Sequence, residues 1–281
     1  MNSYALHLAE LAAINCMLAL GAYVSLSSGL MVVCFGAVMS VGGIAGAAAY
    51  SAGAPYFVAI VIGGIAGALC GGIVCGLCAP LTRFMFAMAT IALGELGRVI
   101  AVNTELLGGA LGYKNVRPDP SVLYSIGLLA TVVAVFRLYE HSPFRIALHL
   151  VKDNDVAASG LGINVARHRV LAVIAASFTV GMGGCLYIHS VGLLDPQTFG
   201  FENSVQILVF ALVGGTASYA GPLAGAVSLT VLPEILRIST SARMLLYGVA
   251  LVAVMAVRPE GLLTSRLGPK PNSAHEPASS S

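Results

Sequence analysis

The chain alternates between long apolar runs and short polar breaks. A run of about 20 apolar residues is long enough to cross the hydrocarbon core of a bilayer as a helix. The pattern predicts about nine membrane-spanning helices, within a range of about eight to ten, at residues 7–27, 30–52, 56–79, 84–102, 121–138, 169–189, 203–219, 222–238 and 243–257. Only the turn Ser27-Ser28-Gly29 separates the first two runs. The seventh and eighth are short and glycine-rich, which leaves room for a re-entrant segment.

Composition supports the same fold class, an all-α, polytopic integral membrane protein. Hydrophobic residues make up 58% of the 281 residues and charged residues 9%, whereas soluble domains average about 45–50% and about 25%. Glu10 is the only charged residue before Arg83. The runs are continuous rather than alternating, which argues against a β-barrel. The N-terminus lacks a positively charged segment, so the first run is interpreted as a retained span and not as a signal peptide.

One hydrophilic interruption, residues 139–169, divides the apolar pattern. Lys and Arg gather in the cytoplasmic loops of membrane proteins, so this segment and the basic C-terminal segment are predicted to lie in the cytoplasm. The loop 190–203 has acidic residues and no basic one, which predicts the outer side. Two basic pairs fall outside against this rule, Lys114 with Arg117 and Arg237 with Arg243. The interruption itself carries seven charged side chains: Glu140, Arg145, Lys152, Asp153, Asp155, Arg167 and Arg169.

The interruption contains signals for two short helices. Pro143 predicts the start of a helix over 143–151. Asp153 or Asn154 can cap a second helix over about 155–160, which two glycines then end, Gly160 and Gly162. The second helix would present a small apolar face suited to docking into a partner's groove, formed by Val156, Ala157, Gly160 and Leu161. An ordinary connecting loop is the alternative interpretation.

A few polar residues within the spans are candidates for a solute path. Glu95 and Arg98 lie three positions apart on one helix face and are predicted to form an ion pair, which is either structural or placed along the path. Uncharged polar residues and glycines would suit a neutral or zwitterionic solute, although Ser and Thr also join helices. The candidate path residues are Thr90, Glu95, Gly214, Gly215 and Ser218.

Glycines repeat at the spacing that lets membrane helices approach closely. Tight helix packing is predicted at Gly63, Gly67 and Gly71, at Gly42 with Gly46, and at Gly221 with Gly225. One internal echo also occurs: LLGGALGY at 106–113 resembles LVGGTASY at 212–219. The predicted topology puts the first outside and the second inside, as an inverted repeat requires.

Catalytic signatures are missing from the sequence. It contains no HExxH, GxSxG or GxxxxGK[ST] motif, so this chain is not expected to hydrolyse nucleotide itself or to act as an enzyme. Cys75 and Cys78 form a CxxC without the further ligands of a zinc site, and all six cysteines are interpreted as small buried apolar side chains. No cofactor or metal is expected in this chain. The net charge of +2 without a basic patch argues against a nucleic-acid partner.

The hydrophilic interruption resembles a known segment. KDNDVAASGLGINVARHR (152–169) is similar to the cytoplasmic coupling segment of permease subunits of branched-chain amino acid ABC transporters, as is SPF at 142–144. Further stretches resemble the family in the same order: RFMFAMATIALGEL (83–96), DPQTFGFENS (195–204), LVGGTASYAGPLAGA (212–226) and RPEGLL (258–263). The sequence departs from the family at GLMVVCFGAV (29–38), which lacks the usual Gln, Ser and His.

This resemblance implies a permease subunit of an importer in the bacterial inner (plasma) membrane. It implies as partners a second related permease, two ATPase subunits and a periplasmic solute-binding protein, which the outer loop 190–203 would contact. Residues 1–263 would form the permease domain, and 264–281 a disordered cytoplasmic tail. The ATPase-coupling residues would be Asp153, Asn154, Asp155, Ala157, Ala158, Gly160, Leu161, Gly162, Ile163 and Asn164.

Other functions stay open at this point. Within the ABC class, the solute is a branched-chain or other small amino acid, or alternatively urea, an amide or a sugar. A standalone secondary transporter or channel is the main alternative from another class, and it would work without any ATPase. A membrane-embedded enzyme is the third, and the missing motifs argue against it.

Overall fold

The described part of the chain consists of helices joined by turns and short loops, without a strand, in the computed structural model. The structure describes residues 2–78, 81–104, 122–193, 195, 200–235, 245–250, 252 and 256. Ten helices are bounded in this part: α1 (Asn2–Ser27), α2 (Phe35–Ser51), α3 (Tyr56–Cys78), α4 (Arg83–Asn103), α5 (Val122–Glu140), α6 (Pro143–Asp153), α7 (Asp155–Gly160), α8 (Val165–Val191), α9 (Phe201–Gly214) and α10 (Ala220–Ile235). The predicted fold class is confirmed.

Eight of the predicted spans correspond to helices α1 to α5 and α8 to α10. Four of these helices are long and apolar enough to cross a bilayer, namely Ala5–Ser27, Tyr56–Cys78, Arg83–Asn103 and Val165–Val191, and α2 and α9 are shorter apolar helices. Of the predicted ninth span, 243–257, the structure describes residues 245–250, 252 and 256, which are helical, and the other residues of the span lie outside the described part. The predicted tail and the first half of the internal echo lie outside this part entirely.

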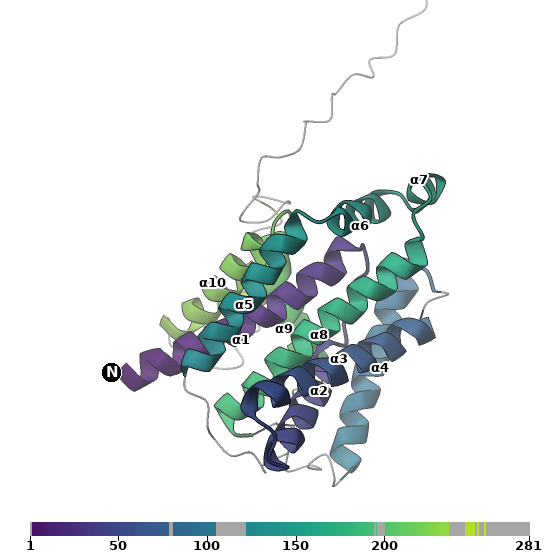
Figure 1. The fold of residues 1–281 in the computed structure, drawn as a ribbon. Helices are drawn as coiled ribbons and strands as arrows, with labels where there is room; N and C mark the ends of the chain where they lie inside the picture. The colour runs from purple at the N-terminus through teal and green to yellow at the C-terminus, as the bar shows by residue number, and fades with distance from the viewer. Residues whose placement is uncertain are drawn as a thin grey trace, which may run out of the picture.

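The helices form a bundle with α8 at its centre. Figure 1 shows α6 and α7 lying across one end of this bundle, which we call the α7 end. The turn 52–55 between α2 and α3 lies at the opposite end, because the rings of Tyr50 and Tyr56 both contact His189 near the last residue of α8. Helices α1, α2 and α3 all pack against α8, and most of its side chains are buried.

Glycines allow α2, α3 and α8 to meet almost backbone to backbone. A Cβ added at Gly67 of α3 would lie 2.6 Å from the carbonyl oxygen of Ser177 in α8. A Cβ at Gly63 would lie 2.7 Å from the carbonyl oxygen of Gly42 in α2. In lipid, where apolar burial gives little drive for helix association, such close packing is a main source of stability. The predicted packing roles of these glycines are confirmed.

Two predicted boundaries are wrong, and each has a local cause. The second span was predicted from residue 30, but α2 begins only at Phe35, after a non-helical stretch, 30–34, that is buried except at Met31. The seventh was predicted to reach residue 219, but α9 ends at Gly214. The next residue, Gly215, has a φ of 97°, a backbone conformation that is open to glycine and would strain other residues.

Candidate coupling segment and solute path

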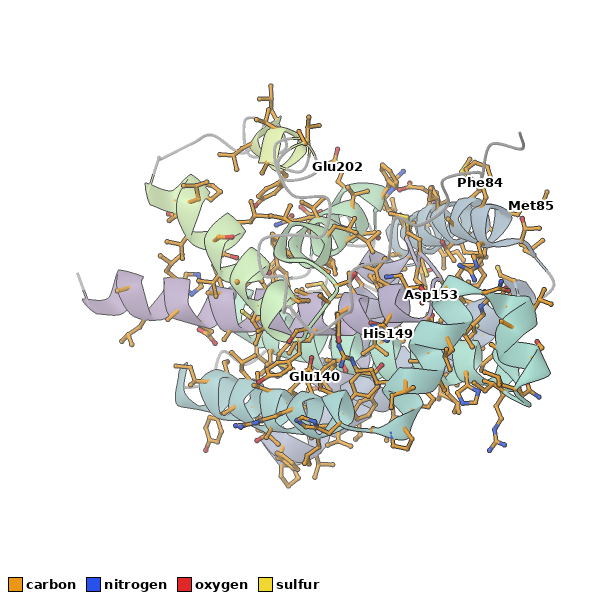
Figure 2. The ribbon with its side chains drawn as sticks, turned by 90° about the horizontal axis from the view of Figure 1, so that it is seen from above. Phe84, Met85, Glu140, His149, Asp153 and Glu202 are labelled. Carbon is orange, nitrogen blue, oxygen red and sulfur yellow. The ribbon has the colours of Figure 1, made fainter. Side chains whose placement is uncertain are left out.

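The polar interruption forms two capped helices at the α7 end. The hydroxyl of Ser142 accepts a hydrogen bond from the amide of Phe144 at 3.2 Å and so caps α6. The side chain of Asn154 accepts hydrogen bonds from the amides of Val156 (2.9 Å) and Ala157 (3.1 Å) and so caps α7. Of the two predicted caps for the second helix, Asn154 is therefore the one used. Both predicted helices are confirmed. Figure 2 labels Glu140 at the end of α5, and His149 and Asp153 in α6, the helix that leads to α7.

The surface of α7 has one buried and several exposed small or apolar residues. Val156 is 81% exposed and Leu161 70% exposed, whereas Ala158 is 1% exposed. Gly160 is also exposed, and a Cβ added there would have no heavy atom within 4 Å. Of the predicted coupling residues, Ala158 therefore anchors α7 to the bundle, and the others next to it form the outer surface.

The rest of the predicted coupling segment turns the chain from α7 into α8. Gly162 has a φ of 80°, which favours glycine at this turn. The side chain of Asn164 accepts a hydrogen bond from the amide of Arg167 at 3.0 Å and caps α8. Asp153 is exposed and Ile163 half-buried. These residues fix the position of α7 relative to a long central helix.

Asp155 joins α7 to two other helices. Its carboxylate accepts a hydrogen bond from Arg83 of α4 at 2.6 Å and two from Arg169 of α8 at 2.8 and 2.9 Å. Burial alone would raise the pKa of this carboxyl, but the hydrogen bonds and charges of Arg83 and Arg169 outweigh it and hold the pKa below its ordinary value. Arg83 also donates to the carbonyl oxygens of Val151 (2.9 Å) and Lys152 (2.8 Å), at the end of α6.

Helix α6 makes a second set of contacts, with the turn between α9 and α10. Arg145 donates to the carbonyl oxygen of Ala217 at 2.6 Å, and its guanidinium lies 3.4 Å from the Glu140 carboxylate. The ammonium group of Lys152 lies 3.5 Å from the hydroxyl of Thr216. The α9–α10 turn therefore lies at the α7 end and contacts the predicted coupling segment directly.

The candidate path residues fall into separate places. Gly214, Gly215 and Ser218 are in or beside the α9–α10 turn. Thr90 is fully buried, and its hydroxyl accepts a hydrogen bond from the amide of Val33 at 3.1 Å. Thr90 therefore satisfies one backbone group of the non-helical stretch 30–34. Non-helical backbone at membrane depth is tolerated where protein buries it and satisfies its polar groups.

Glu95 lies further along α4, towards the opposite end of the bundle. The predicted pair with Arg98 is confirmed, with the Arg98 Nε donating to Glu95 Oε2 at 2.8 Å. The other oxygen, Oε1, accepts the backbone amide of Phe201 at 2.8 Å. A carboxylate at a helix N-terminus is stabilised by the helix dipole, so Glu95 joins α4 to the first residue of α9. The structure does not bring Glu95 together with the glycines of the α9–α10 turn.

Comparison with known proteins identifies the family of the chain. The family described as "Branched-chain amino acid transport system / permease component" matches residues 4–255. The chain belongs to this permease family. With its apolar helices, the permease is a multi-pass membrane protein, and a transport subunit of its family rather than a catalytic one.

Two curated relatives carry the same printed name, high-affinity branched-chain amino acid transport system permease protein LivM. The Escherichia coli protein is 25% identical over 293 aligned positions, covering 91% of this permease and 69% of the relative. The Salmonella typhimurium protein is 26% identical over 212 positions, covering 63% of this permease and 50% of the relative. This permease therefore spans only part of the length of the relatives that it matches.

Several polar contacts in this permease were not predicted. Glu10 of α1, whose side chain is 8% exposed, accepts a hydrogen bond from the hydroxyl of Ser125 in α5 at 3.2 Å. As the only charge before Arg83, Glu10 was visible in the sequence, and an ionisable residue in a span calls for a partner. The contacts of Arg83 had no such signal, because its partners lie about 70 positions away in the chain.

The cysteines and histidines of the described part do not gather into a ligand set. The six cysteines are free, and five of them are buried while Cys70 is half-buried. Among the residues that the structure describes, no three His, Cys, Asp or Glu side chains are placed to hold a metal ion.

Proposed function

We propose that this permease is the membrane-spanning subunit of an ATP-driven importer for branched-chain or other small amino acids in the bacterial inner membrane. Two ATPase subunits would hydrolyse ATP, a second related permease would complete the path, and a periplasmic binding protein would deliver the solute. Family membership and the printed names of the two relatives support this class of solute.

The observation that carries the proposal is the exposed apolar surface of α7. Val156 and Leu161 are 81% and 70% exposed in a short helix at the end of the bundle, within a segment whose basic residues predict the cytoplasm. Lipid does not cover apolar side chains there, whereas the groove of a partner protein does. The ion contacts of Asp155 and the buried Ala158 hold α7 in place. A partner that binds this surface therefore does not have to order α7, and little binding free energy is lost to conformational entropy.

The docking role is tested best at Gly160. A Cβ added at this position meets no heavy atom within 4 Å, so we expect Gly160→Trp to leave the fold intact while it adds bulk to the docking surface. We expect normal membrane insertion but a loss of ATPase co-purification and of radiolabelled leucine uptake of about tenfold or more, the size of a disrupted interface centre. A bulky residue at Ala158 would also block uptake, but by disturbing the packing of α7.

Gly127→Trp is the matched control. Gly127 is an exposed helical glycine of α5, and a Cβ added there also has open space. It lies away from α7, so uptake and ATPase recruitment should stay as in the wild type. Normal recruitment and uptake in Gly160→Trp would contradict the docking role of α7. Uptake by the wild type that needs no ATP and follows an ion gradient, without any co-purifying ATPase, would instead identify a secondary transporter.

A further inference from the structure

Helix α4 is held to the rest of the bundle by a narrow apolar stripe. Only four of its residues are buried: Phe86, Thr90, Gly94 and Ala101. A Cβ added at Gly94 would lie 3.5 Å from Cys34, and one added at Gly97 would lie 3.4 Å from Ala37, so α4 lacks the interlocking seen between α3 and α8. Such a contact resists sliding and rolling of the helix only weakly, so the polar contacts of α4 decide how it is held.

Three polar side chains hold α4 to other segments: Arg83 at its first residue, the buried Thr90, and Glu95 further along the helix. At the α7 end, Arg83 binds Asp155 of α7 and two carbonyl groups at the end of α6, with distances of 2.6 to 2.9 Å. Towards the opposite end, Glu95 binds the amide of Phe201 at 2.8 Å. Phe84 and Met85, beside Arg83 at the start of α4, are exposed (Figure 2), so Arg83 is the group that ties this turn to the coupling segment.

Helix α9 repeats this pattern in the opposite direction. Its first residue, Phe201, is held by Glu95, and the turn after its last residue is held by Arg145 and Lys152 of α6. At about 1.5 Å per residue, the 13 steps of α9 span about 20 Å and the 12 steps from Arg83 to Glu95 span about 18 Å. The two helices therefore connect the same two places over nearly equal lengths.

Helix α9 ends at a glycine turn, in which Gly215 has a φ of 97°. A rigid helix that is bounded by a glycine turn can change direction as a unit, since few residues need to change their backbone angles. Two helices, α4 and α9, therefore link α6 and α7 to the Glu95–Phe201 contact. A displacement of α6 and α7 can reach this contact through either helix.

We infer that α4 and α9 act as a pair of struts that carry movement of the α6–α7 segment to the junction of Glu95 with the N-terminus of α9. Arg83 and Glu95 are positioning residues in this inference, because the contacts used here join them to other helices of the permease. The inference rests on the proposed function, because it assumes that ATPase subunits move α7.

The test measures how many solute molecules enter for each ATP hydrolysed. The permease is purified with its co-purifying ATPase and permease partners, reconstituted into liposomes with the solute-binding protein, and supplied with radiolabelled leucine and ATP. For Glu95→Ala we expect uptake per ATP to fall about tenfold while ATP hydrolysis continues, the equivalent of one charge-assisted hydrogen bond. Glu95→Gln, which can still accept the Phe201 amide, should retain most of the wild-type ratio.

Arg83→Lys provides the second variant. It keeps the positive charge but loses the planar fork that reaches Asp155 and the two carbonyl groups, so the same drop in the ratio is expected. Asn103→Ala is the control on the same helix, because the Asn103 side chain is exposed and, among the residues that the structure describes, donates only to the carbonyl oxygen of Val99 within α4. Its ratio should equal that of the wild type.

The outcomes separate the two levels of inference. If uptake and ATP hydrolysis fall in proportion in Glu95→Ala and Arg83→Lys, or if neither changes, the strut role is overturned while the proposed function stands. If the wild-type complex takes up leucine without ATP, both are overturned. Should Glu95→Ala fail to assemble, Glu95→Gln and Arg83→Lys decide, since equal ratios in the wild type and Arg83→Lys overturn the inference.

Discussion

A methyl group at Gly67 would lie 2.6 Å from the carbonyl oxygen of Ser177 and 2.9 Å from the Cα of Gly181. Both of these are backbone atoms of α8, so they cannot rotate away. Gly67→Ala is therefore expected to destabilise the bundle by about 1–3 kcal/mol, the usual cost of overpacking. Thermal unfolding of the purified permease in detergent measures this.

The same substitution in an open place of α3 provides the comparison. A Cβ added at Gly76 has no heavy atom within 4 Å, and alanine favours a helix over glycine. Gly76→Ala should melt at or slightly above the wild-type temperature. Equal melting of Gly67→Ala and Gly76→Ala would contradict the close approach of α3 and α8.

The charge of Asp155 sets a pH prediction. Its folded-state pKa lies below the ordinary value of 3.8, so its ion contacts stabilise the fold above that pH and are lost as the pH falls through the folded pKa. Between about pH 5 and 8 the carboxylate stays charged, and Asp155→Asn should lower the melting temperature by a constant amount. The difference from wild type should shrink below about pH 4. A difference that instead changes steeply between about pH 6 and 8 would point to another titrating group.

Single residues differ in how far the sequence reveals their contacts. The Glu95–Arg98 pair was predictable because three positions on a helix place two side chains on one face. The contact of Glu95 with the amide of Phe201 joins residues 106 positions apart, and that of Arg83 with Asp155 joins residues 72 positions apart. Such contacts depend on how whole helices pack, which no local pattern in one sequence specifies.

At the scale of the element, Asn154 both ends α6 and begins α7. Removal of its side-chain cap in Asn154→Ala should cost α7 about 1 kcal/mol, because the amides of Val156 and Ala157 lose their acceptor. Hydrogen exchange of a peptide covering 154–162 should then become faster, with little change in the bundle helices. Ser159→Ala, which removes an exposed hydroxyl of α7 without removing a cap, should leave exchange unchanged. Equal protection in both variants would contradict the capping role.

Local signals predicted these short helices well and the start of α2 badly. Pro143 begins a helix, Asn154 caps one, and Gly162 lies in the turn after one. Each acts within its own turn of the chain, so both helices of the interruption were predictable. Residues 30–34 are as apolar as the helix that follows, yet they are not helical. The hydrogen bond from the Val33 amide to Thr90, 57 positions away, helps to satisfy this backbone, and hydropathy carries no information about it.

At the scale of the whole molecule, apolar run lengths predicted most helices and the class of the protein, while the arrangement at the two ends came from the packing. The α7 end carries the basic residues Arg83, Arg145, Lys152 and Arg169, with Glu140, Asp153 and Asp155 as acidic residues beside them. The opposite end carries the turn 52–55 and the start of α5. Because basic residues favour the cytoplasmic side, this asymmetry predicts one orientation for the entire bundle.

Cysteine labelling in intact cells tests that orientation. A cysteine introduced at Ser159, exposed on α7, should react with a membrane-impermeant maleimide only after the inner membrane is opened. One introduced at Ala52, exposed in the turn at the opposite end, should react in intact cells whose outer membrane is permeabilised. The wild type provides the background, because its native cysteines are buried or half-buried. The reverse pattern would place α7 outside, where no ATPase can reach it, and would contradict both the orientation and the docking role.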